Sequence, residues 1–182
     1  MIISIHQPNF IPWYPFFQKI QAVDKFIILS HCQFEKNGYT NRFMLGDRWH
    51  TMSVKKGLIP IREKYYADPH TDWRKIKNKL PAYGNILNEL DDCIFESLEK
   101  TNVLIINKIM SMLDINTEIV MDHPTTLRST HRLIDICQRH GATEYLSGAG
   151  GKNYLDTKLF QDSKIKLSFQ GGIEKKHVLE VL

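Results

Sequence analysis

The sequence predicts an α/β fold: a Rossmann-like three-layer domain with a mostly parallel sheet. Short runs of β-branched and aromatic residues alternate with helical segments along most of the chain. The first thirty residues contain a strand, a loop, a helix and a second strand, which is the order of a βαβ unit. The length of 182 residues fits one domain with its own core.

The N-terminal part carries the βαβ unit. A β-branched run over 2–5 predicts a buried strand, which Pro8 and Pro12 end abruptly. Residues 14–23 predict a short helix with an aromatic inner face. Residues 25–29 are continuously apolar, as in a strand that is buried on both faces of a parallel sheet.

The middle of the chain predicts a β-hairpin and a helical segment, inserted at about 43–100 into a single α/β domain over 1–182. The expected elements are strands at 43–45 and 50–54, an irregular charged stretch at 60–73, and helix over 71–113 with a break at 81–84.

The C-terminal part returns to alternating strands and helices. Ser129 or Thr130 can cap the start of a helix there, and Gly141 suits the C′ position at its end. The expected elements are a strand at 118–121, a helix at 129–140, and strands at 144–146 and 164–169.

The composition is that of an ordinary globular protein, with 42% hydrophobic and 24% charged residues and a net charge of +4. Basic residues are scattered, whereas a nucleic-acid surface is usually denser in them, so nucleic-acid binding is disfavoured. No apolar run reaches the roughly 18 residues of a membrane span, and the N-terminus lacks the features of a signal peptide. Three widely spaced cysteines argue against a disulfide framework, so a reducing, cytoplasmic location is expected.

Three polar loops, at 6–13, 31–42 and 147–154, follow strands that we assign to the central sheet. The carboxyl ends of parallel strands share one edge of a sheet, so loops that are far apart in sequence can converge there. The sequence therefore predicts a ligand site at this edge.

The first two loops supply candidate catalytic and substrate-binding side chains. His6 can act as a general acid or base, or can bind a phosphoryl or carbonyl oxygen, and Asn9 is the second catalytic candidate. Arg42 can pair with a carboxylate or phosphate through its fork of donors. Structural alternatives stay open, since His6 can cap a strand end, Asn41 can hold a turn and Arg42 can be solvated. The substrate-binding candidates are Gln7, Trp13, Gln33, Asn41 and Arg42.

The third loop is rich in glycine and has a lysine near its end. Glycine amides can approach an anion closely, so the loop can hold a phosphate or a cofactor, although a plain glycine turn is the alternative. Asn153 stands where a Walker A loop has its hydroxyl, so the loop is not of that type. The candidate residues are Ser147, Gly148, Gly150, Gly151, Lys152 and Tyr154.

Metal and thiol chemistry are disfavoured. Seven of the eight histidines follow the opening motif, and none of them forms a ligand pair at helical spacing. Cys32 is a weak candidate nucleophile, because adjacent residues of a strand point in opposite directions and His31 would point away from it. No metal is expected, and no motif in the sequence identifies a cofactor.

The chain resembles the WbqC-like protein family over nearly its whole length. The resemblance rests on HQPNFIPW at 6–13, QF at 33–34, TNR at 40–42 and YLSG at 145–148, with Gly151 and Tyr154. Members of that family are associated with gene clusters for bacterial surface polysaccharides such as O-antigen, so the resemblance implies a pathway more than a reaction.

Two departures from the family pattern stand out. Ser30 and His31 occupy positions where members tend to carry an acidic pair, and the chain stops soon after Gly172, whereas members are usually longer. A missing terminal element would leave a groove open or mark a truncated product. A weaker likeness, at the level of the fold, is to nucleotidylyltransferases with an H-x-G-H motif, but this chain has only His6 of the two histidines.

Together these features predict a transferase that acts on an activated sugar or amino-sugar, with an acyl or nucleotidyl donor. The alternative is a non-catalytic protein that binds nucleotide-sugars or serves as a scaffold in a glycan-assembly complex. The expected partner is a small-molecule substrate, and a second copy in a homodimer stays open. RNA binding, which rests on the pI of about 8.9, is a third and weaker reading.

Overall fold

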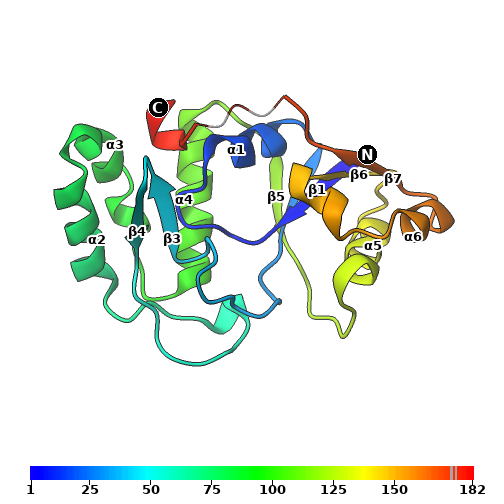
Figure 1. Ribbon diagram of the computed structural model, residues 1–182, viewed down its shortest axis with the longest axis horizontal. Coiled ribbons are helices and arrows are strands. Elements are labelled where there is room, and N and C mark those ends of the chain that lie inside the picture. Colours follow the sequence, from blue (N-terminus) through cyan, green and yellow to red (C-terminus); the bar gives the residue numbers. More distant parts are fainter. Residues whose placement is uncertain (173, 175) are drawn as a thin grey trace. The chain divides into compact units, whose positions relative to one another are not determined.

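A computed structural model describes residues 1–172, 174 and 176–182 (Figure 1). The chain forms two compact units, each assembled from three separate segments. We call them the sheet unit and the hairpin unit. The expectation of one domain over 1–182, with an insertion at about 43–100, stays a prediction. The sheet unit consists of Met1–His6, Pro15–Leu29 and Asn116–Glu174, and the hairpin unit of Gln7–Tyr14, Ser30–Ile115 and Lys175–Leu182.

The sheet unit is built on a parallel sheet, which confirms the predicted α/β fold. Among the described residues it has five strands in the order β5-β2-β1-β6-β7, and every neighbouring pair is parallel. The chain moves outward from β1 through β2 to β5 and then returns to the other side of β1. The strands are β1 (Ile2–His6), β2 (Lys25–Ile28), β5 (Glu118–Met121), β6 (Glu144–Ser147) and β7 (Lys166–Phe169).

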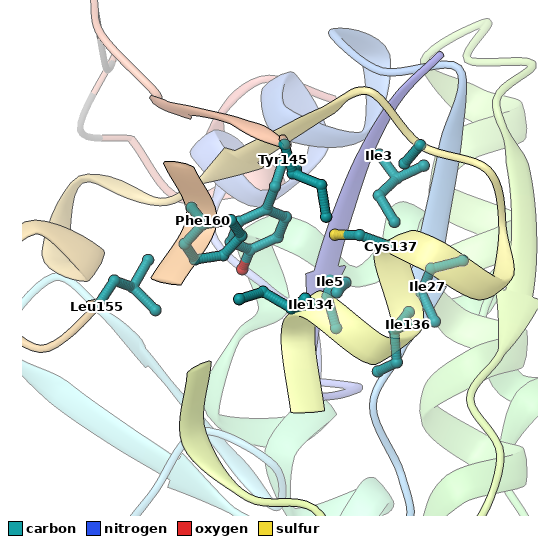
Figure 2. Packing of buried hydrophobic residues seen from close by; sticks show 11 residues of the cluster. Ile3, Ile5, Ile27, Ile134, Ile136, Cys137, Tyr145, Leu155 and Phe160 are labelled. Atoms are coloured by element: carbon teal, nitrogen blue, oxygen red, sulfur yellow. The ribbon is translucent and has the colours of Figure 1, made fainter. Parts of the chain in front are cut away.

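Helices cover both faces of this sheet. On one face Phe16 of α1 (Tyr14–Gln21) meets Phe26 of β2, with ring centroids 5.2 Å apart. The next residue, Ile27, points to the opposite face and joins a buried cluster with α5 (Ser129–Arg139) and α6 (Thr157–Asp162), shown in Figure 2. The three-layer arrangement follows from this alternation.

The hairpin unit contains the predicted β-hairpin and most of the predicted helical segment. Strands β3 (Arg42–Leu45) and β4 (Arg48–Thr51) are antiparallel and join through a two-residue turn, in which Gly46 has a φ of +59°. The helices and helical turns are η1 (Ile61–Glu63), α2 (Pro69–Lys79), η2 (Pro81–Tyr83), α3 (Gly84–Asn88), η3 (Asp91–Cys93), α4 (Leu98–Met112) and η5 (Val178–Glu180).

Several predicted boundaries in the hairpin unit are wrong. The second hairpin strand is shifted and covers 48–51 instead of 50–54. Helix α2 begins at Pro69, inside the stretch expected to be irregular, because the Asp68 carboxylate accepts the Thr71 N–H and a proline fits the first turn. The expected long helix is also interrupted at 89–97, before Ser97 caps α4.

The sheet unit differs from the prediction at two element starts. Neither Ser129 nor Thr130 caps α5, since Ser129 has a φ of +48° and the Thr130 hydroxyl accepts the Asp156 N–H instead. The last strand begins two residues late, because Lys164 takes a left-handed φ of +57°. Gly141 has a φ of +64° after α5, as predicted. Among the described residues, no helix is long and apolar enough to cross a membrane.

Candidate functional site

The carboxyl edge of the parallel sheet carries two of the predicted site segments. His6 ends β1, and Ser147 ends the neighbouring strand β6, from which the glycine-rich loop continues. The order of strands reverses between β1 and β6, because β2 and β5 lie on one side of β1 while β6 and β7 lie on the other. Open α/β sheets bind ligands at such a reversal, outside the carboxyl ends of the strands.

His6 is held at this edge by its main chain and by an aromatic contact. Its carbonyl accepts the N–H of Leu29 at 2.8 Å, which continues the pairing of β1 with β2. Its imidazole meets the ring of Phe16 edge-on, with centroids 5.1 Å apart and an interplanar angle of 88°. The residue is partly buried, and its ring faces the α1 side of the sheet.

The glycine-rich loop forms a short 3₁₀ turn, η4 (Ala149–Asn153). Gly151 is buried, and a Cβ at this position would lie 2.1 Å from the Ser147 Oγ, so packing alone accounts for this glycine. At Gly148 and Gly150, in contrast, a Cβ would meet nothing within 4 Å. These two positions therefore leave their backbone approachable.

The end of the same loop is exposed. Lys152 places its Nζ 5.5 Å from the centroid of the Phe169 ring, at the end of β7. Tyr154 is 74% exposed. The structure thus keeps the predicted loop residues together at the end of β6, with a cation at the edge of the loop.

In the hairpin unit the first two predicted loops lie side by side. The Phe10 N–H donates to the Tyr39 carbonyl at 2.9 Å. The side chain of Asn102, on α4, is fully buried and donates to the carbonyls of Pro8 and Thr40, both at 2.7 Å. Its own Oδ1 accepts the Tyr66 hydroxyl at 2.8 Å. One amide therefore joins the loop of Gln7 and Asn9 to the loop of Asn41 and Arg42.

The first loop makes contacts with the rest of the hairpin unit at several points along its length. Gln7 donates from Nε2 to the Cys32 Sγ at 3.4 Å, and Asn9 is buried. Ile11 has a φ of +41°, which is rare for a β-branched residue and needs support from its surroundings. Trp13 is 48% exposed and forms an antiparallel bridge with His177.

His177 also packs at the centre of the hairpin unit. Its ring lies 5.0 Å from that of Phe43, and its Nδ1 accepts the Leu179 N–H at the start of η5. Burial lowers the pKa of His177 to about 4, so the imidazole is neutral near neutral pH.

The second loop uses its polar side chains for its own structure. Asn41 is buried and donates from Nδ2 to the Met52 carbonyl at 2.8 Å. Arg42 donates from Nε to the Gly38 carbonyl at 3.2 Å and from Nη2 to the Asn37 carbonyl. Gln33 is exposed, and its main chain bridges to Pro60. The alternative in which Asn41 holds a turn accounts for the contacts of Asn41. The substrate-binding roles of Gln33, Asn41 and Arg42 stay predictions.

Comparison with known proteins agrees with the opening motif. The model of the WbqC-like protein family matches residues 7–176, which is far more than half of the chain. The chain belongs to the WbqC-like family. The uncharacterized protein Rv1507c of Mycobacterium tuberculosis is 29% identical over 186 aligned residues, which cover 92% of this chain and 80% of that protein.

Among solved structures, one match is a mutant variant of zinc-bound AdcAII from Streptococcus pneumoniae. It is 10% identical, covers 98% of this chain and 93% of its own, and has a TM-score of 0.27. That score is too low to support an argument about fold or ligand.

Sequence reasoning missed two buried polar groups of this WbqC-like chain. Asn102 interrupts the apolar stripe of α4, and this break in the pattern was the available signal. Asp122 follows β5 at the carboxyl edge of the sheet, is buried, and accepts from Nη2 of the buried Arg132 on α5. The Nε of Arg132 has no partner among the described residues. No spacing rule pointed to this pair.

The cysteines of the WbqC-like chain differ in exposure. Burial raises the pKa of Cys93, and raises that of Cys137 to about 12, so both thiols stay protonated near neutral pH. Cys32 is partly exposed. Within the described part of the chain, no group of three or more His, Cys, Asp or Glu side chains could hold a metal ion.

Proposed function

We propose that this WbqC-like chain is a group transferase that acts on an activated sugar or amino-sugar intermediate of bacterial surface-polysaccharide biosynthesis. The transferred group is an acyl or nucleotidyl group. The observation that carries the proposal is the reversal of strand order between β1 and β6, with His6 and the glycine-rich loop at the two strand ends.

The proposed roles follow from the chemistry of the groups at that edge. The imidazole of His6 accepts the proton of the acceptor hydroxyl or amine while that oxygen or nitrogen bonds to the acyl carbon or phosphorus of the donor. The thiolate or pyrophosphate of the donor leaves with the electron pair of the broken bond. The approachable amides at Gly148 and Gly150 bind a phosphate of the donor, and Lys152 adds a positive charge. Tyr154 adds an exposed hydroxyl at the end of this loop, and the buried Ser147 and Gly151 support the loop by packing against each other.

The hairpin unit carries the remaining candidate residues, and for this unit we propose a substrate-binding role of its own. Asn9, the second catalytic candidate, lies in its first loop with Gln7 and Trp13, and Gln33, Asn41 and Arg42 lie in its second loop. Arg42 has fewer N–H groups left for a ligand than the sequence suggested, because two of its nitrogens already donate to main-chain carbonyls.

Binding is tested first, with the Tm of the full chain measured against nucleotide-diphosphate sugars, acyl-CoA thioesters and free nucleotides. Gly150→Ala is the informative variant, because its Cβ fits without contact yet would block the approach of a ligand to the backbone. Gly84→Ala is the matched control, since that position is equally open. We expect a donor to raise the Tm of the wild type and of Gly84→Ala, with a smaller rise for Gly150→Ala.

Catalysis is tested second, by incubating the stabilising donor with candidate acceptors and following the transferred group by mass spectrometry. His6→Ala should bind the donor but lose transfer, while His70→Ala, which removes an exposed histidine of α2, should keep it. Stabilisation without transfer by any acceptor would favour the alternative of a non-catalytic nucleotide-sugar-binding or scaffolding protein. Equal donor effects on Gly150→Ala and on the wild type would contradict the proposed phosphate loop.

A further inference from the structure

The hairpin of β3 and β4 has two unlike faces. Phe43 and His50 point inward, are buried, and stack with ring centroids 5.0 Å apart. The other face carries Met44 directly across from Trp49, and these side chains are 39% and 38% exposed. Two large apolar groups therefore lie next to each other in water.

A third exposed group enlarges this surface. Tyr39 precedes β3 and is 55% exposed, and its ring centroid lies 5.3 Å from that of Trp49. The Arg42 guanidinium lies over the indole of Trp49, with its carbon 3.9 Å from the ring centroid. We call Tyr39, Trp49 and Arg42 the hairpin platform.

The platform is pre-organised by the main chain. The two bonds from Arg42 to the carbonyls of Asn37 and Gly38 fix the guanidinium in place. Asn37 has a φ of +67°, so the turn beneath the guanidinium adopts the left-handed conformation that asparagine tolerates. A ligand that meets the platform would not have to order these side chains, which lowers the entropic cost of binding.

We propose that the hairpin platform is a saccharide-binding site, which takes one pyranose ring. This inference rests on the proposed function for the identity of its ligand. The C–H groups on one face of a pyranose are apolar and fit against an aromatic ring, while its hydroxyls accept from guanidinium N–H groups and bond with the Tyr39 hydroxyl.

The geometry of the two rings favours a sugar over a nucleobase. The rings of Tyr39 and Trp49 are inclined at 51° to each other, so a flat base can stack on one ring but not on both. A pyranose chair directs C–H groups in several directions, so it can contact the Tyr39 ring together with the part of Trp49 that stays exposed beside the Arg42 guanidinium. Three side chains also offer far less area than a stable protein interface requires.

A purely structural role is the competing explanation. Cross-strand packing of Met44 on Trp49 and the cation–π contact of Arg42 stabilise a two-stranded sheet, which is marginal alone. That role explains the contacts of Arg42 and Trp49. It does not explain Tyr39, which lies outside the strands and is more than half exposed. Tyr39 therefore separates the two explanations.

The test is an NMR titration of the full chain with free glucose, galactose, N-acetylglucosamine and glucuronate, each added separately into the millimolar range. The signal is the indole N–H of Trp49, assigned with Trp49→Phe. The indole N–H of Trp73, which is buried and donates to Asp91 at 2.7 Å, is the internal reference. We expect a saturable shift of the Trp49 signal with at least one sugar, and about tenfold weaker binding in Tyr39→Ala.

Tyr65→Ala is the matched control, because Tyr65 is 45% exposed in the same unit and lies 5.4 Å from the Lys55 ammonium. It should bind the sugar like the wild type. The inference is overturned if no sugar moves the Trp49 signal, or if Tyr39→Ala binds as tightly as Tyr65→Ala. Free sugars carry no phosphate, so these results stand apart from the donor-binding test. If a donor binds but no free sugar moves the Trp49 signal, only the saccharide-binding role of the platform is refuted. If a free sugar moves that signal but no donor binds, only the proposed transferase function is refuted.

Discussion

Replacing Asn102 with leucine tests how the two substrate loops are held. Leucine has the same branching and number of side-chain heavy atoms as asparagine, so no cavity forms, but it removes both donors and the acceptor of the amide. The carbonyls of Pro8 and Thr40 and the hydroxyl of Tyr66 then lose their partner inside the protein. The expected result is a large loss of stability from a substitution that leaves the apolar core filled.

The magnitude follows from the three groups left without a bond. Each buried polar group that loses its partner costs about 1–3 kcal/mol, so the sum is roughly 3–6 kcal/mol after partial relaxation. Typical domains have a free energy of unfolding of about 5–15 kcal/mol, so the variant should approach the limit of folding. Tyr66→Phe, which removes only the hydroxyl, should cost about 1–2 kcal/mol.

Urea denaturation followed by tryptophan fluorescence measures the free energy of unfolding of each variant. Asn107→Leu is the matched control, because Asn107 lies on the exposed side of the same helix. In a double-mutant cycle, Asn102→Leu and Tyr66→Phe should be coupled, since they share one hydrogen bond. A loss below about 1 kcal/mol for Asn102→Leu, or a loss equal to that of Asn107→Leu, would refute the reasoning.

Three more predictions concern other buried groups. Arg132→Met removes the Arg132 guanidinium from the buried Asp122 carboxylate and should lower the free energy of unfolding by about 3 kcal/mol. An unchanged urea midpoint would argue against the pair. Gly151→Ala places a Cβ on the Ser147 Oγ and should lower the Tm. Adding Ser147→Gly to this variant should restore part of the lost Tm, whereas additive losses from the two substitutions would contradict the contact. The folded-state pKa of His177 is about 4 and its unfolded value is near 6.5, so the unfolded chain takes up this proton first as the pH falls. The free energy of unfolding should therefore decline by on the order of 3 kcal/mol between about pH 6.5 and pH 4. In a pH series of urea midpoints, His177→Asn should show a shallower decline than the wild type.

The strands were predictable because their cause is local. The apolar runs at 25–29 and 118–121 predict strands, and the structure contains both strands with almost the same bounds. The interruption at 89–97 was not predictable from periodicity, since Leu90 and Ile94 continue the apolar pattern of the neighbouring helices and are buried in the residues that directly flank the 3₁₀ turn η3. Tertiary packing decides that backbone, and no local signal reports it.

For the candidate site, the sequence predicted the placement of groups better than their roles. It predicted that His6 and the glycine-rich loop follow strands of one sheet, and the structure has them at the ends of adjacent strands. Two interpretations changed because the residues found partners within their own loops, four or five residues away. Arg42 is occupied by its own turn, and Gly151 makes room for Ser147. Such partners appear only when the fold is known.

The interleaving of the two units has a consequence for biosynthesis. The central strand β1 is made first, but its partner β6 is made near the end, and the Ser4 hydroxyl bonds to a carbonyl 142 residues away. On the ribosome, β1 and β2 can pair early, and one edge of β1 then waits unpaired through most of translation. The nascent chain should thus be most vulnerable to aggregation before β6 emerges, and no single cut can release either unit intact.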